Sequence, residues 1–483
     1  MAAMWKRRLR WVFTRHLCFG GLATALVFFG LSMTPSLVPR SWFLQGAVSG
    51  VSAVIGYGIG SAISAGIRTR LRNEPSARTK RIAWWVLAAA TVLFGGFALW
   101  QGAEWQQDVR SLMDMEQLDT FEWFAILVVA VIIAWVLLVT SRFIRGGTRI
   151  VIRWLDKIMP RRVSVIGGVA IAVIVVLGFI QGVLFDGMVS AVNSAYSVTD
   201  RDTSPWISQP QSELRTGGPD TLVAWNTLGQ KGRDFTGDGG GPTQEDIAAF
   251  TGGEAMEPIR VYVGLRSADT VEERVDLALQ ELDRTGAFER SVLAVMTTTG
   301  TGWIDENVAD SIEFLHGGDT ASVGLQYSYL PSWVSFLVDR SKASDAGRGL
   351  INAVSERVQS MPEDDRPLLL VFGESLGSYG TEEAFADLED LRSSVDGAML
   401  VGPTFTNPLH GELTDERDED SPAWRPVVDD GDEVRFAVDP DDLDDPEIHP
   451  STAEWDDPRV VYLQNSSDPI TYFNPDLLWS CLL

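Results

Sequence analysis

The stretch Pro367-Leu-Leu-Leu-Val-Phe-Gly-Glu-Ser-Leu-Gly377 indicates the fold of the second half of the chain. Its first six residues have the length and apolarity of a buried strand, and a helical pattern begins at Leu376. Between them, Gly373 and Gly377 place small residues two positions on either side of Ser375. A serine at so sharp a strand-to-helix turn stands exposed at the end of its strand, where it can act as a nucleophile. We therefore predict that Ser375 is a nucleophile. The alternative is a glycine-rich turn with an incidental serine.

Short apolar runs alternate with helical patterns on both sides of this stretch. Such alternation predicts an α/β domain with a mostly parallel sheet and helices on both faces. The predicted strands are 259–265, 291–297, 321–327, 367–372, 398–401, 433–438 and 460–464, and the predicted helices are 271–284, 307–315, 346–359 and 376–390.

Two further groups belong with a serine nucleophile at this position. An oxyanion hole would use the backbone N–H of Leu376 together with an amide from the small-residue loop after residues 291–297, where Thr301 and Gly302 are the best donors. An ordinary glycine turn is the alternative reading of that loop. Asp468 follows the last predicted strand and suits the acid that orients an imidazole, although many other acidic residues lie nearby.

The general base is harder to place, because the expected chain order is Ser, Asp or Glu, and then His. No His follows Asp468 in the remaining 15 residues. The four histidines are His16 beside a membrane span, His316 at a helix end, and His410 and His449 in polar loops after the serine. A capping role suits His316, and surface roles suit His410 and His449, better than catalysis does.

Neither a metal nor a cofactor is expected. The two cysteines, Cys18 and Cys481, form no zinc-type Cys/His spacing and no disulfide framework. Asp234 to Glu245 has a passing similarity to a calcium loop, but Pro242 stands at its ninth position, so a glycine-rich connector is favoured. We read the acidic tract 415–457 as a solvated surface, with weak divalent binding as the alternative.

The first part of the chain differs sharply in charge from the second. Residues 1–187 contain 20 basic and 9 acidic residues, a net charge of +11, whereas the remainder contains 19 basic and 56 acidic residues, a net charge of −37. An acidic half of this size argues against nucleic acid as a partner, because phosphate binding needs clustered Lys and Arg.

Five uncharged stretches in the basic part are long enough to span the hydrocarbon core of a bilayer, which needs about 20 residues. The predicted α-helical transmembrane bundle consists of Leu17–Pro39, Ser41–Ile67, Ile82–Ala103, Trp123–Ser141 and Val163–Phe185. Eighteen basic residues lie before the first span and in the second and fourth loops, against only Arg40 and Arg110 in the other two. The positive-inside rule therefore predicts a multi-pass cell-membrane protein with a cytoplasmic N-terminus and an extracytoplasmic C-terminal part.

These features predict three regions, which are a five-span domain at 1–187, a connector at 188–255 and an α/β domain at 256–483. The second span contains Gly46-xxx-Gly50 and Gly56-xxx-Gly60, which we read as sites of helix packing inside the bundle, with a dimer face or a ligand groove as alternatives. No charged residue lies in mid-membrane, so the bundle resembles an anchor more than a transporter.

Several of these stretches together resemble a family of actinobacterial membrane proteins that join an N-terminal multi-span domain to a C-terminal α/β-hydrolase domain. The matching stretches are 258–265, 299–303, 326–333, 373–377, Asp468-Pro469 and 474–479. The resemblance implies serine-dependent ester or acyl chemistry, with Ser375 as nucleophile and Asp468 as acid. Members of the family continue beyond the last stretch to a His-bearing segment, so we expect this chain to be truncated and to lack its base.

The sequence therefore predicts a serine hydrolase of the esterase or lipase type. Its tether to the membrane favours a lipid or cell-envelope ester as substrate. Tyr327, Tyr329, Leu330, Trp333 and Phe336 are candidates for an apolar mouth, and core packing is the alternative for them. An acyltransferase and a non-catalytic membrane scaffold are the rival functions, and the oligomeric state is left open.

Overall fold

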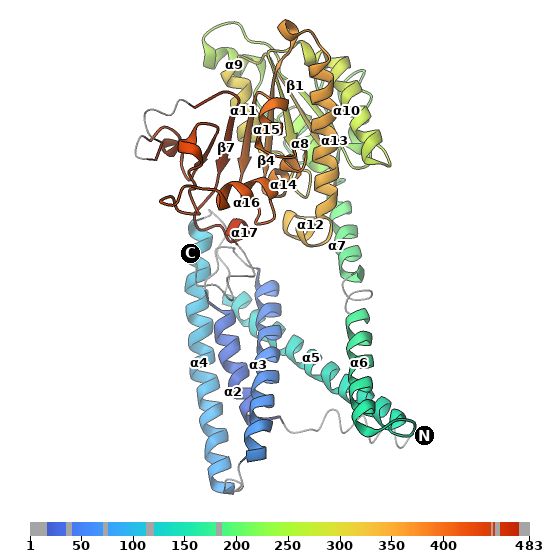
Figure 1. Ribbon diagram of the computed structural model, residues 1–483, viewed down its shortest axis with the longest axis vertical. Coiled ribbons are helices and arrows are strands. Elements are labelled where there is room, and N and C mark those ends of the chain that lie inside the picture. Colours follow the sequence, from blue (N-terminus) through green and yellow to red (C-terminus); the bar gives the residue numbers. More distant parts are fainter. Residues whose placement is uncertain are drawn as a thin grey trace. The chain divides into compact units, whose positions relative to one another are not determined.

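The computed structural model describes residues 17–34, 41–70, 76–112, 120–179, 186–445, 448–449 and 455–472. The chain divides into two compact units, Met1–Leu184 and Phe185–Leu483. Figure 1 shows the helical first unit in blue to green and the mixed second unit in green to red.

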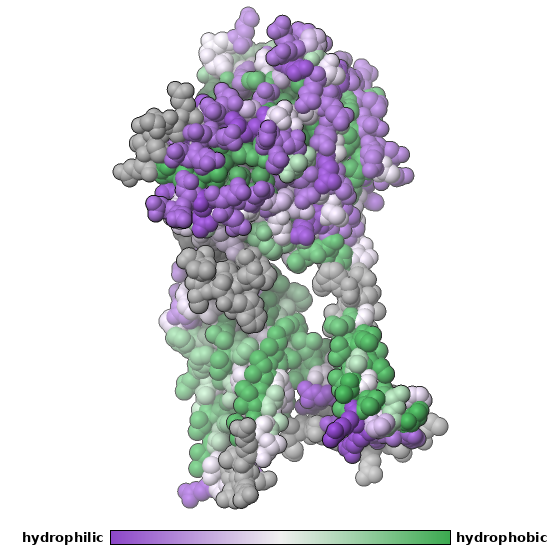
Figure 2. All heavy atoms as spheres, in the orientation of Figure 1, coloured by the Kyte–Doolittle hydropathy of each residue, from purple (hydrophilic) through white to green (hydrophobic). Residues whose placement is uncertain are grey.

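The first unit consists of long apolar helices. They are α2 (Phe19–Ser32), α3 (Trp42–Arg70), α4 (Ala77–Leu112), α5 (Thr120–Leu155) and α6 (Arg161–Phe179). In the described part of the chain, four helices are long and apolar enough to cross a membrane, over Trp42–Thr69, Ala77–Ser111, Glu122–Leu155 and Arg161–Gly178. Their surfaces are mostly green, hence hydrophobic, in Figure 2, with some purple, hydrophilic areas.

Helix α2 corresponds to the first of the five predicted spans and is shorter than expected. It has 14 residues, or about 21 Å of helix, against a hydrocarbon core of about 30 Å. The last part of that predicted span, residues 35–39, lies outside the described residues. The structure therefore supports four of the five predicted spans by length and composition.

The four glycines of the two predicted pairs in α3 lie at close helix contacts, which confirms the packing interpretation of their spacing. A Cβ on Gly60 would stand 2.3 Å from the Gly20 carbonyl oxygen of α2, and one on Gly50 would stand 2.8 Å from the Ala130 carbonyl oxygen of α5. Any larger residue would force these backbones apart, so the two glycine pairs fix α3 between α2 and α5.

The second unit is built on a seven-stranded sheet in which every pairing is parallel. Its strands are β1 (Ile259–Val263), β2 (Val292–Thr297), β3 (Thr320–Leu325), β4 (Leu368–Glu374), β5 (Gly397–Val401), β6 (Val434–Ala437) and β7 (Arg459–Leu463), in the order β1-β3-β2-β4-β5-β7-β6. Every residue of β1, β2 and β3 is buried, as expected for a sheet that is covered on both faces. All seven strands correspond to predicted ones.

Helices connect and cover these strands. They are α7 (Asp186–Thr199), α8 (Gly229–Thr236), α9 (Gln244–Thr251), α10 (Val271–Thr285), α11 (Glu306–Leu315), α12 (Ser332–Val338), α13 (Arg340–Gln359), α14 (Leu376–Glu382), α15 (Leu388–Ser394), α16 (Pro408–Asp415) and α17 (Pro469–Tyr472). The chain also contains the short 3-10 helices η2 (Trp225–Thr227), η3 (Ala287–Glu289), η4 (Glu363–Asp365), η5 (Asp429–Gly431) and η6 (Pro440–Leu443).

The predicted helix 376–390 is interrupted, and the structure has α14 and α15 in its place. The Asp387 side chain accepts a hydrogen bond from the Asp390 amide and caps the start of α15. A side-chain N-cap of this kind stabilises the start of a new helix, so α15 begins separately from α14, which ends at Glu382.

Much of the predicted connector 188–255 belongs to the α/β unit. Val223, Leu228, Phe235 and Ile247 are at most 2% exposed, and the first three of them belong to the main hydrophobic core. Arg260 on β1 also reaches back, and its guanidinium donates to the carbonyls of Phe235 and Gly240. These contacts make the segment part of the domain, although its short helices show no long apolar period.

The same segment does not form the calcium loop that was considered for it. Asp234, the first position of that loop, lies inside α8, and its carboxylate pairs with Lys231 at 3.2 Å. Among the described residues no group of three His, Cys, Asp or Glu side chains is arranged to bind a metal ion.

Candidate active site

Ser375 lies at a strained turn between β4 and α14. Its backbone angles are φ 53° and ψ −117°, a region that non-glycine residues rarely occupy. Such a conformation costs on the order of 1–3 kcal/mol and persists only where surrounding contacts enforce it. One such contact is the hydrogen bond from the Ser375 amide to the Val401 carbonyl at 2.8 Å.

The two glycines that flank Ser375 are required by close backbone contacts. A Cβ on Gly377 would stand 2.4 Å from the carbonyl oxygen of Thr297 at the end of β2. A Cβ on Gly373 would stand 2.6 Å from the Gly377 carbonyl oxygen. The turn is thus packed tightly against the neighbouring strand. This packing explains why the sequence has glycine two positions on either side of Ser375.

The backbone of the loop after β2 lies beside the same turn. The Thr298 carbonyl oxygen would be 3.1 Å from a Cβ on Gly377. Within this loop the Gly302 amide donates to the Thr299 carbonyl at 2.9 Å, and the Thr299 amide donates to the Trp303 carbonyl at 3.0 Å. In the part of the chain that the structure describes, the Thr298 and Thr301 amides have no acceptor. Of the two predicted donors in this loop, only Thr301 therefore has a free amide.

Leu376 is the first residue of α14 and is fully buried beside Ser375. The first helical turn leaves its backbone N–H groups without intrahelical partners. Leu376 thus supplies an N–H directly after the serine, where a predicted oxyanion donor should lie.

Asp468 reaches the same edge of the sheet from β7. Its Oδ2 atom would be 3.8 Å from a Cβ on Gly402, the residue after β5. Its Oδ1 accepts a hydrogen bond from the Ile470 amide at 2.7 Å, which fixes the carboxylate at the start of α17. The Val401 carbonyl binds the Ser375 amide, and Gly402 lies beside Asp468. Ser375 and Asp468 therefore lie against two consecutive residues at the end of β5.

A family described as "Alpha/beta-hydrolase family" matches residues 259–481, and one described as "Alpha/beta-hydrolase family N-terminus" matches residues 33–242. The chain belongs to this alpha/beta-hydrolase family. The two matches extend over both structural units and confirm the resemblance seen in the sequence. No curated protein and no solved structure matches the chain.

Two of the three described histidines lie at the edge of the sheet opposite Ser375. The ring of His449 packs on Gly431, before the start of β6, and exposed His316 follows α11 just before β3. Both are therefore at the amino edge of the sheet, opposite the serine. His410 is buried, and its Nε2 is 2.6 Å from Gln464 Oε1. His16 lies outside the described residues.

Glu374 is a titratable group at the site to which the sequence analysis gave no role. Burial raises the pKa of this carboxyl to about 7, and the negative charge of Asp305 adds to the shift. Its Oε2 atom is buried and has no hydrogen-bond partner among the described residues. The available signal in the sequence was an acidic residue at the end of an apolar strand.

A second buried carboxyl, Glu382, links the far end of α14 to its neighbours. It accepts hydrogen bonds from Asn407 Nδ2 at 2.8 Å, Tyr462 OH at 2.9 Å and the Leu409 amide at 2.9 Å. Burial raises its pKa to about 7 in spite of these donors. The network ties the helix after the serine to α16 and to β7, the strand before Asp468.

The aromatic cluster after β3 is divided between core and surface. Tyr327 and Leu330 are 2% and 1% exposed, so most of the surface of both side chains packs in the interior. Trp333 is 62% exposed, and Phe336 packs edge-on against Phe405 with ring centroids 5.2 Å apart.

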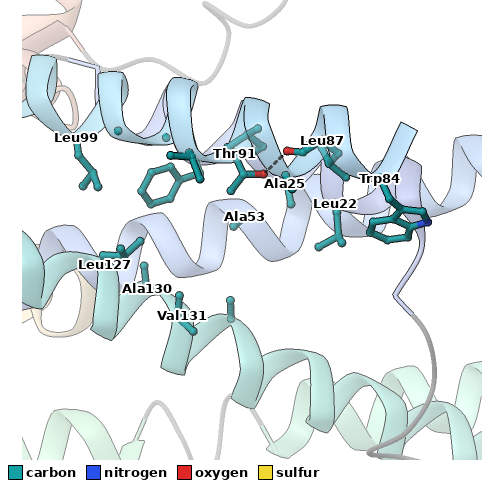
Figure 3. A pocket seen from close by; sticks show the side chains of 17 residues that line it. Leu22, Ala25, Ala53, Trp84, Leu87, Thr91, Leu99, Leu127, Ala130 and Val131 are labelled. Carbon is teal, nitrogen blue, oxygen red and sulfur yellow. Dashed lines mark hydrogen bonds between the residues drawn. The ribbon is translucent and has the colours of Figure 1, made fainter. Parts of the chain in front are cut away.

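The helical unit contains a separate cavity of about 760 Å³ between α2, α3, α4 and α5. Figure 3 shows side chains such as Leu22, Leu99 and Val131 pointing into it. None of its lining residues is charged, and the Thr91 hydroxyl donates to the Leu87 carbonyl at 2.8 Å. This cavity offers hydrocarbon contact and no group for ester chemistry.

Proposed function

We propose that this protein is a membrane-anchored serine hydrolase that cleaves ester bonds. The observation that supports the proposal most directly is the positive-φ conformation of Ser375 between a parallel strand and a helix, because strain of this kind is typical of functional positions. Family membership supports a hydrolase-type scaffold.

The chemistry that suits this arrangement is acyl transfer through the serine. Ser375 Oγ attacks the ester carbonyl, and the tetrahedral oxyanion accepts hydrogen bonds from the Leu376 amide and from an amide of the β2 loop. Collapse of the intermediate expels the alcohol and leaves an acyl group on Ser375, and attack by water then releases the acid. In the loop after β2, the Thr301 amide is the predicted donor to the oxyanion. The Thr298 carbonyl of the same loop lies beside the turn that contains Ser375.

The proton transfer needs a base that Asp468 would orient. Of the described histidines, His316 and His449 lie at the opposite edge of the sheet and His410 is hydrogen-bonded to Gln464, so none of the three is positioned as this base. The same observation favours the second candidate, a membrane scaffold with a hydrolase fold but no catalysis.

We further propose that the substrate is a lipid or cell-envelope ester at the outer face of the cell membrane. The α/β unit is joined by its chain to helices that are apolar enough to cross a bilayer. The basic residues of the loops support a cytoplasmic N-terminus and an extracytoplasmic α/β unit. An acyltransferase would use the same acyl-enzyme with an alcohol in place of water.

Ester hydrolysis by the full chain in bilayer nanodiscs tests the proposal. We expect 4-nitrophenyl octanoate to be hydrolysed by the wild type and not above background by Ser375→Ala. Partition of the octanoyl group to added glycerol would identify an acyltransferase. Equal rates for the wild type and Ser375→Ala would overturn the proposal in favour of the scaffold.

A further inference from the structure

A cavity of the α/β unit lies at the carboxyl ends of β1 and β3. It has a volume of about 390 Å³ and is lined by Leu265 after β1, the first turn of α10, and residues 327–329 after β3. Asn193 of α7 and Lys342 of α13 complete the wall. Ligands of open parallel sheets bind at this edge. None of the residues proposed for ester chemistry lines the cavity.

Arg274 lines this cavity and is a buried cation without a carboxylate partner in the described part of the chain. The residue is 5% exposed, and its Nε has no hydrogen-bond partner. One terminal nitrogen, Nη1, donates to the Ala268 carbonyl at 3.2 Å. Buried Arg260 on β1, by contrast, pairs with Glu313 at 2.7 Å and Asp310 at 2.5 Å.

This difference points to a missing anion. A buried charge is strongly destabilising unless a counter-charge and hydrogen bonds compensate for its lost hydration. Burial accordingly lowers the pKa of Arg274. The acidic residue in the lining, Asp269, is solvent-exposed, so water screens its charge.

Tyr327 adds a second unused donor to the same wall. Its side chain is 2% exposed, and its hydroxyl has no partner among the described residues. Buried tyrosine hydroxyls usually find a hydrogen-bond partner. Arg274 and Tyr327 thus both line this cavity, and each has a buried polar atom without a partner among the described residues.

A cleft adjoins this cavity and could hold the part of a ligand that lies beyond its anionic group. It has a volume of about 370 Å³ and shares Asn193 and Lys342 with the first cavity. Val189, Leu330 and Val338 contribute apolar surface to it, which suits a hydrocarbon segment. Lys342 at the junction is half exposed and pairs with Asp339 at 2.8 Å.

We propose that the Arg274–Tyr327 cavity binds an amphipathic organic anion. Its carboxylate or phosphate accepts hydrogen bonds from the Arg274 guanidinium and the Tyr327 hydroxyl, and its hydrocarbon part lies in the adjoining cleft. The site requires no reaction at Ser375, so it goes beyond the proposed hydrolase function and does not depend on it.

Equilibrium binding to the full chain in phosphatidylcholine nanodiscs tests this site. The probes are hexanoate and hexyl phosphate, with uncharged hexanol as the control ligand. We expect saturable binding of at least one anion, weaker binding of hexanol by about tenfold or more, and weakening with added salt. The anion that binds with the higher affinity identifies the preferred head group as carboxylate or phosphate.

Two variants and two controls locate the binding. Arg274→Gln should weaken anion binding by about tenfold or more, the effect expected for a charge-assisted hydrogen bond. Tyr327→Phe should weaken it by a few-fold, with a melting temperature equal to or above that of the wild type, because the lost hydroxyl has no partner. Arg357→Gln, which removes an exposed arginine paired with Asp283, should bind as the wild type does, and so should Ser375→Ala.

Three results would overturn the proposal. They are equal affinity for hexanol and both anions, wild-type affinity in folded Arg274→Gln and Tyr327→Phe, and the absence of saturable binding of either anion. Loss of binding in Arg357→Gln to the same extent as in Arg274→Gln would also contradict it.

Discussion

The backbone N–H of Ser375 donates a hydrogen bond to the carbonyl of Val401, the last residue of β5, at 2.8 Å. This bond fastens the serine to the neighbouring strand while its φ angle of 53° turns the chain sharply into α14. The next residue along, Gly402, lies beside the Asp468 carboxylate. The end of β5 therefore positions both the candidate nucleophile and the candidate acid.

Gly377→Ala should destabilise the α/β unit, because the new methyl group would collide with the Thr297 carbonyl oxygen. We expect a loss of about 2 kcal/mol or more, typical of overpacking against backbone that cannot move. Thermal or urea unfolding measures the change. Gly411→Ala in α16 is the matched control, since a Cβ there meets no atom within 4 Å and alanine favours a helix. Equal stability of the two variants would contradict the tight turn.

Asp468→Asn should slow ester hydrolysis by about 10²-fold or more, because asparagine cannot stabilise an imidazolium. The fold should remain intact, since asparagine can still accept the Ile470 amide as an N-cap. Steady-state rates with 4-nitrophenyl octanoate measure the effect. Asp420→Asn, at an exposed position of the same acidic region, is the control. An unchanged rate in Asp468→Asn would remove this residue from the site.

Glu374 should make stability depend on pH. Its folded pKa of about 7 lies above the ordinary value of 4.5, so its stabilising contribution is complete below pH 4.5 and is lost as pH rises through 7. The free energy of unfolding should therefore fall as pH rises. With allowance for partial exposure, Glu374→Gln should reduce this fall by about 2 kcal/mol. Glu382 contributes with the same sign, so part of the slope should remain. Unfolding free energies at pH 4.5, 6 and 8 test this, and an unchanged slope in Glu374→Gln would contradict it.

The proposed orientation predicts opposite labelling of two engineered cysteines. In a Cys18→Ser, Cys481→Ser background, Ser360→Cys in the α/β unit should react with a membrane-impermeant maleimide in intact cells. Ser76→Cys, in the basic loop between α3 and α4, should react only after the cells are opened. Both serines are exposed. The reverse pattern would place the α/β unit in the cytoplasm.

Local signals in the sequence predicted the features that depend on neighbouring residues. The seven strands, the Gly373 and Gly377 contacts and the helix packing at Gly50 and Gly60 are of this kind. Each follows from an apolar run or from a small residue at a fixed spacing, which one segment shows by itself.

Features that depend on distant contacts were missed. The segment with Leu228 and Phe235 was predicted as a connector, because its burial arises from β1 and not from any period of its own. The raised pKa of Glu374 likewise depends on burial and on Asp305, which is 69 positions away in the chain. The Gly302 amide, a predicted oxyanion donor, is used instead by a local turn to Thr299.

Fluorophosphonate labelling of the membrane-embedded full chain tests the central claim most directly, because the reagent forms a covalent bond only with an activated serine. The account predicts that the wild type is labelled at Ser375 and that Ser375→Ala is not labelled at all. A folded wild-type chain that resists labelling, or a Ser375→Ala variant labelled as strongly as the wild type, would contradict the assignment of Ser375 as a catalytic nucleophile.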